Sequence, residues 1–76
     1  MQNTLVMIHV RFAPDGSVTE IGERPPDLPP QEWFNRLSLR AAAAYQALSG
    51  GRGLFRLPRD EVIALQAAGV NEGSLA

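Results

Sequence analysis

The residue best suited to acid–base chemistry in this chain of 76 residues is its single histidine, His9. An imidazole can serve as a general base near neutral pH, but it needs a nucleophile or another ionisable group held beside it. No serine or cysteine motif accompanies His9, and no acid stands at a telling spacing from it. We therefore expect His9 to be a half-buried or surface histidine of a strand, with no catalytic role.

The carboxylates also give no sign of catalysis or metal binding. Glu20 and Glu23 stand near an expected strand end, and Asp60 and Glu61 suit the first turn of a helix, where they complement its dipole. Catalytic carboxylates need one acid desolvated in a cleft, for which so short a chain has little room. The chain has no cysteine, and no carboxylates cluster at ligand spacing near His9. The sequence predicts no enzyme, no cofactor and no metal site.

A glycine-rich segment, residues 49–53 (SGGRG), superficially resembles a phosphate-binding loop. It follows a predicted helix rather than a strand, and it lacks the Gly-Lys-Ser/Thr ending of such loops. We expect it to cap that helix and to form a flexible turn. The functional alternative is that Arg52, held between glycines, projects to contact an anion.

The charge pattern bears on the class of partner. All seven basic residues are arginine, against eight acids, and the formal net charge is −1. A general nucleic-acid binder usually carries a clear basic excess. Arginine suits bidentate contacts to carboxylate or phosphate, although a GC-rich genome also favours it. A nucleic-acid binder remains the alternative function, and it requires five arginines to converge on one face: Arg11, Arg36, Arg40, Arg52 and Arg56.

The segment of residues 65–75, LQAAGVNEGSL, resembles the core of a helix-turn-helix, whose turn carries a glycine followed by an apolar residue. Gly69 and Val70 occupy those two positions. Leu65 stands where the motif usually has alanine. The resemblance implies DNA binding through this segment.

Two strands joined by a turn are expected at the start of the chain. Residues 4–12 alternate with a period of two, which predicts a strand with one apolar face toward the core and a second face that mixes apolar and polar side chains. The core face holds Val6, Ile8, Val10 and Phe12, and the mixed face holds Leu5, Met7, His9 and Arg11. Pro14 and Gly16 suit a hairpin loop with a bulge, and residues 17–23 form the return strand.

A long helix is expected next, over residues 31–48, after a stiff proline-rich connector at residues 24–30. Its apolar stripe consists of Trp33, Phe34, Leu37, Ala41, Ala44, Tyr45 and Leu48. Leu39 points away from this stripe. One edge of the helix is a flat surface of Arg36, Arg40, Ala43 and Ala47. We expect Trp33, Leu37, Ala41 and Ala44 to face the core side of the first strand.

The remaining elements complete an α+β fold. Residues 53–57 form a third strand, and Pro58 opens a second helix that ends at Gly69. The predicted order is β-β-α-β-α, a three-stranded antiparallel sheet with the long helix packed on one face. Residues 1–70 form the single domain and residues 71–76 a frayed tail. The second helix either flanks the first or covers part of the other face of the sheet.

These features favour a small non-enzymatic binding or accessory protein. A core this thin, with no disulfide or metal, often relies on a partner subunit. We expect a protein partner or a second copy in a homodimer, no membrane and no small-molecule substrate. The apolar stretch of residues 5–8 is too short for a signal peptide, so we expect a soluble, cytoplasmic protein. Small arginine-rich proteins without enzyme motifs are common in phage and mobile elements, which favours a small inhibitor or assembly factor. The candidate partner-binding residues are Leu5, Met7, His9, Arg11, Arg36, Arg40, Arg52, Leu54 and Arg56.

Overall fold

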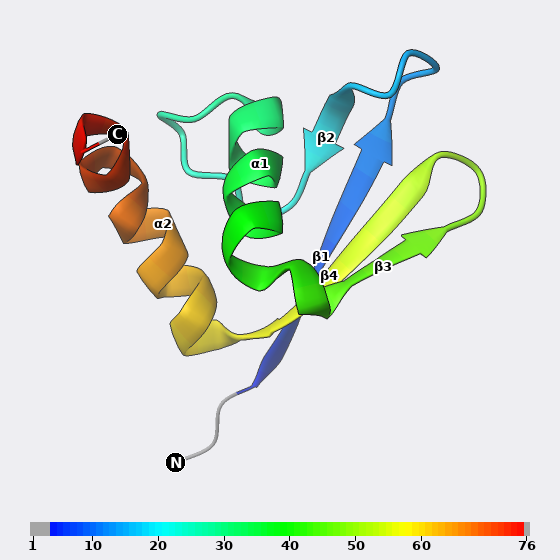
Figure 1. The fold of residues 1–76 in the computed structure, drawn as a ribbon. Coiled ribbons are helices and arrows are strands. Elements are labelled where there is room, and N and C mark those ends of the chain that lie inside the picture. Colours follow the sequence, from blue (N-terminus) through cyan, green and yellow to red (C-terminus); the bar gives the residue numbers. More distant parts are fainter. Residues whose placement is uncertain (1–3, 76) are drawn as a thin grey trace.

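The computed structural model describes residues 4–75, with side chains described for residues 4–67. It is an α+β fold in which a four-stranded antiparallel sheet, of order β2-β1-β4-β3, packs against two helices (Figure 1). The elements in chain order are β1 (Leu5–Phe12), β2 (Val18–Ile21), α1 (Pro30–Ala41), the short 3₁₀ helix η1 (Ala42–Ala44), β3 (Tyr45–Leu48), β4 (Arg52–Pro58) and α2 (Arg59–Leu75).

The predicted first hairpin is confirmed, but its return strand is shorter than residues 17–23, because β2 spans only Val18–Ile21. β1 pairs with β2 in antiparallel register, and a bulge lies between Arg11 and Phe12. Asp15 organises the turn, because its Oδ1 accepts hydrogen bonds from the backbone N–H of Ser17 at 2.9 Å and from the Ser17 hydroxyl at 2.7 Å. Such an Asx-type turn holds the chain in position to reverse direction.

The prediction of one long helix over residues 31–48 is wrong in its second half. α1 ends at Ala41, whose backbone leaves the helical region at φ −137° and ψ 39°, and residues 45–48 form β3. Gly50 and Gly51 do not cap a helix; their positive φ values of 78° and 70° turn the chain between β3 and β4. The alanines favour a helix, but the tertiary pairing of Tyr45 with Phe55 outweighs that propensity. The sheet therefore has four strands rather than three.

The second helix runs further than predicted. α2 spans Arg59–Leu75 without a break at Gly69. The resemblance to a helix-turn-helix therefore fails, because the residues that would form the turn of that motif are helical. A glycine inside a helix costs only about 1 kcal/mol relative to alanine, which does not by itself end the helix. The fraying of residues 71–76 stays a prediction, because their side chains and all of Ala76 lie outside the described residues.

The core lies between one face of the sheet and both helices. Val6, Ile8 and Val10 of β1 are buried there, as the period-two pattern predicts. The predicted helical face is confirmed as well, since Trp33, Leu37 and Ala41 are buried and Ala44 packs against them. From α2, Val62 and Leu65 join the same core, so this helix flanks α1 rather than covering the opposite face.

A connection between β2 and α1 ties the helices to the sheet. The indole Nε1 of buried Trp33 donates a 2.9 Å hydrogen bond to the carbonyl oxygen of Gly22. Glu23 adopts a left-handed conformation at φ 61° and pairs in bidentate fashion with Arg59 at the start of α2. Its carbonyl oxygen also accepts a 2.8 Å bond from Nε2 of Gln66. These contacts fix α2 against the loop that follows β2.

Candidate functional site

The face of the sheet that neither helix contacts, here called the outer face, is the candidate site. Figure 1 shows α1 and α2 together on one side of the strands, and the buried residues of both helices belong to the same core cluster. Leu5 and Met7 of β1 point to the outer face and are 58% and 56% exposed. Alternation along β1 puts His9 and Arg11 on this face too, and both are exposed.

Pairing of the strands places the candidate residues of β4 beside those of β1. Met7 is opposite Arg56, and Arg11 is opposite Arg52. His9 is opposite Leu54, and Gln46 of β3 flanks Leu54 on its other side. The register places Leu54 on the outer face, as predicted, but its exposure is only 6%. The apolar part of the outer face is therefore provided chiefly by Leu5 and Met7.

Charged side chains line an open depression at one end of the outer face. It has a volume of about 230 Å³ and is lined by His9, Val10, Arg11, Glu20 and Arg52. Nε of Arg11 lies 3.5 Å from Oε1 of Glu20, and both side chains are largely exposed. Nε of Arg52 donates a 3.2 Å hydrogen bond to the carbonyl oxygen of Ser49. Arg11 and Arg52 are cross-strand partners and both line the depression, so it offers two guanidinium groups to a carboxylate or another anion.

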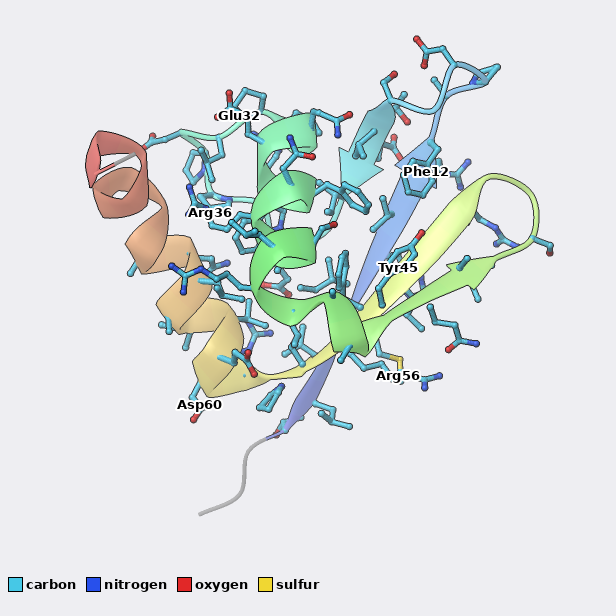
Figure 2. All side chains as sticks on the ribbon, viewed as in Figure 1. Phe12, Glu32, Arg36, Tyr45, Arg56 and Asp60 are labelled. Carbon is cyan, nitrogen blue, oxygen red and sulfur yellow. The ribbon has the colours of Figure 1, made fainter. Side chains whose placement is uncertain are left out.

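The five arginines of the nucleic-acid alternative do not converge on one face. Arg11, Arg52 and Arg56 lie on the outer face, whereas Arg36 and Arg40 belong to α1, which packs on the opposite face. Figure 2 shows Arg36 at α1 and Arg56 at the strands. Arg36 and Arg40 both interact within the chain.

The predicted flat edge of the helix does not exist as such. Ala43 lies in η1 and Ala47 in β3, so neither continues the surface of α1 that Arg36 begins. The four residues share one edge only if the helix continues to residue 47, whereas α1 ends at Ala41.

Clear pKa shifts occur at Asp15, in the turn of the first hairpin, and at Arg59, at the start of α2. The hydroxyl and backbone N–H of Ser17 lower the pKa of the Asp15 carboxyl below its ordinary value. The hydrogen bonds from Arg59 to Glu23 raise the pKa of the Arg59 guanidinium. Neither group lies on the outer face. Within the described part of the chain, no three His, Asp or Glu residues are grouped so that they could hold a metal ion.

The sequence pattern did not predict that Gln46, Leu48 and Glu20 also lie on the outer face; Glu20 is there because it pairs with Arg11. Gln46 and Leu48 lie on it because β3 pairs with β4 at Leu54 and Arg52. The Gly-Gly pair at residues 50–51, flanked by short apolar segments, was the signal that could have revealed this hairpin.

Comparison with known proteins adds no family to this description. No protein-family model matches the chain, and no match was found among curated proteins or solved structures. No helix in the described residues is long and apolar enough to span a membrane.

Proposed function

We propose that this protein is a non-enzymatic binding protein whose outer face docks on an acidic surface of another protein. The observation that carries the proposal is the uncovered sheet face, on which Leu5 and Met7 are more than half exposed. A contiguous apolar surface rimmed by polar groups is typical of a protein interaction site.

The charge of the outer face selects the kind of partner. Arg11, Arg52 and Arg56 lie on it, and Glu20 is the acid that balances one of them. A partner with carboxylates beside an apolar patch would complement both parts of this surface, with Leu5 and Met7 next to Arg56 and the Arg11–Arg52 pair further along the strands. Rim charges of this kind guide orientation and association rate more than affinity.

A second copy docked face to face fits this surface poorly. A two-fold axis through the outer face would bring the arginines of one copy against those of the other, and opposed like charges weaken association. A different protein with an acidic surface carries no such penalty. Binding without catalysis on such a partner is the action of an inhibitor or an assembly factor.

The test compares wild type with three single variants as bait in a lysate of the native host. Met7→Glu and Arg56→Glu each place a negative charge on the outer face, and Leu39→Glu is the matched control because Leu39 is 78% exposed on α1. We expect a protein that wild type and Leu39→Glu capture and that the other two lose. With that protein purified, each outer-face variant should raise the Kd at least about tenfold, the effect of an interface residue worth ~1.4 kcal/mol.

Two outcomes would overturn the proposal. In the first, the captured protein is lost with Leu39→Glu and retained with Met7→Glu, which would move the interface to α1. In the second, no protein is captured but a fluorescent DNA or RNA duplex binds wild type and not Arg56→Glu. That result would establish the nucleic-acid alternative.

The non-enzymatic part of the proposal has its own measurement. His9 lies exposed on the outer face opposite Leu54, with no hydroxyl nucleophile as its cross-strand partner. We expect less than stoichiometric zinc after dialysis of the purified protein, and no turnover that His9→Ala abolishes. Zinc retained at one equivalent, or turnover lost in His9→Ala, would contradict this part.

A further inference from the structure

The two edges of the sheet differ in how they are protected against pairing with another chain. At one edge, β2 carries the charged Glu20, pairs with β1 through a bulge and is followed by Gly22 and a proline-rich loop. Charges, bulges and prolines are the usual means by which edge strands avoid other strands. At the other edge, β3 has the sequence Tyr-Gln-Ala-Leu, with no charge and no proline, and its register with β4 is regular. Figure 1 shows β3 as the outermost strand on that side.

The hydrogen-bonding groups at the β3 edge follow from the register. The N–H of Phe12 donates to the carbonyl oxygen of Gly51. Because hydrogen-bonded pairs alternate along an antiparallel ladder, Val10 and Ile8 also direct their backbone N–H and carbonyl groups toward β4. Their partners in β4 include Gly53 and Phe55, and the residues between those, such as Leu54, therefore face β3.

Gln46 and Leu48 bond to β4 as a consequence, and the polar groups of Tyr45 and Ala47 point outward. The N–H of Tyr45 is already bonded to the carbonyl oxygen of Ala42. The groups directed at the free edge are therefore the carbonyl of Tyr45 and both the N–H and the carbonyl of Ala47.

We propose that two copies of this chain pair through β3 in antiparallel orientation and form one continuous sheet across the dimer. A two-fold axis perpendicular to the sheet relates antiparallel neighbours and leaves both outer faces on the same side. The dimer would then present two copies of Met7 and of the three outer-face arginines on one broad surface. This inference goes beyond the proposed function and does not depend on it.

The absence of charged side chains on β3 favours a second copy of this chain as the partner that pairs with it. β3 is uncharged, so its self-pairing opposes no like charges, unlike a face-to-face contact through the arginines. The formal net charge of −1 also gives little overall repulsion between copies. β3 has no basic side chain that could form an ion pair with an acidic strand of another protein.

The test is analytical ultracentrifugation over a concentration series from micromolar to millimolar. Gln46 is exposed on β3, so Gln46→Glu and Gln46→Lys should fold normally while placing like charges near the axis. We expect wild type to dimerise with rising concentration, and each variant alone to have its dissociation constant raised about fivefold. An equimolar mixture of the two should restore association, because opposite charges then face each other.

Ala47→Pro gives a second, independent reading. Proline at this position removes an N–H that points outward and keeps the bonds between β3 and β4, as edge strands allow. Its dissociation constant should rise at least about tenfold. Thr19→Glu on β2 is the matched control at the other edge and should leave dimerisation unchanged. Tryptophan fluorescence of buried Trp33 reports in each case that the variant is folded.

The proposal is overturned if wild type stays monomeric to millimolar concentration. It is also overturned if the dimer persists in all three β3 variants, or if Thr19→Glu disrupts it. Met7→Glu and Arg56→Glu should leave the dimer intact, so failure of this inference and failure of the outer-face proposal are distinguishable.

Discussion

The phenol ring of Tyr45 lies directly over Gly53, its diagonal neighbour across the strands β3 and β4. A Cβ added at Gly53 would come within 2.6 Å of Cε1 and 2.7 Å of Cζ of that ring, and closest to the phenol oxygen. The same ring lies 4.9 Å from the ring of Phe55 and 5.9 Å from that of Phe34, between centroids. The absence of a side chain at Gly53 is therefore what lets an aromatic cluster close over the end of the sheet.

Gly53→Ala should destabilise the domain by about 1–3 kcal/mol, because the extra methyl group displaces the Tyr45 ring from this cluster. Urea unfolding followed by Trp33 fluorescence measures the change. The double variant with Tyr45→Val tests the cause, since valine keeps strand propensity but does not cover Gly53. An equal penalty for Gly53→Ala in both backgrounds would show that the ring is not responsible.

Leu37→Ala should cost about 2–5 kcal/mol, a large fraction of the stability of a small domain. Leu37 is 0% exposed in the core between α1 and the sheet. Leu39→Ala is the matched control on the same helix, because Leu39 is 78% exposed, and it should change the free energy of unfolding by less than about 0.5 kcal/mol. A cost below that figure for Leu37→Ala would mean that the leucine is not a core residue.

The hydrogen bond from Trp33 to Gly22 predicts a measurable penalty for Trp33→Phe. Phenylalanine keeps an aromatic ring in the core but leaves the carbonyl oxygen of Gly22 without its indole donor. The lost bond and the smaller ring together should cost about 1–3 kcal/mol. The measurement is urea unfolding followed by circular dichroism, since the variant has no tryptophan. A change under about 0.5 kcal/mol would show that solvent replaces the indole fully.

The parts of the fold that sequence could predict are those with one clear period. β1 alternates over eight residues and α1 repeats at helical spacing as far as Ala41, so both core faces were predictable. β3 was not, because residues 41–44 are alanines that suit a helix and only pairing with Phe55 makes Tyr45 a strand residue. The outer face was predictable where β1 supplies it and was missed at Gln46 and Leu48. The placement of Arg36 and Arg40 away from it depends on which face α1 covers, which periodicity alone does not specify.

The Asp15 turn predicts a specific dependence on pH. The hydroxyl and the backbone N–H of Ser17 bond to the ionised carboxylate, so the pKa of Asp15 is lower in the folded state than its ordinary value of 3.8. The stabilising contribution of this group is therefore complete above pH 3.8 and is lost as the pH falls through the lowered folded pKa. Ser17→Ala removes the hydroxyl donor, the largest cause of the shift, and should move the pKa of Asp15 upward while the backbone donor keeps part of the effect. Carboxyl NMR titration of wild type and Ser17→Ala measures both values. A wild-type pKa at or above the ordinary value, or one that Ser17→Ala leaves unchanged, would show that these hydrogen bonds do not hold the carboxylate in solution.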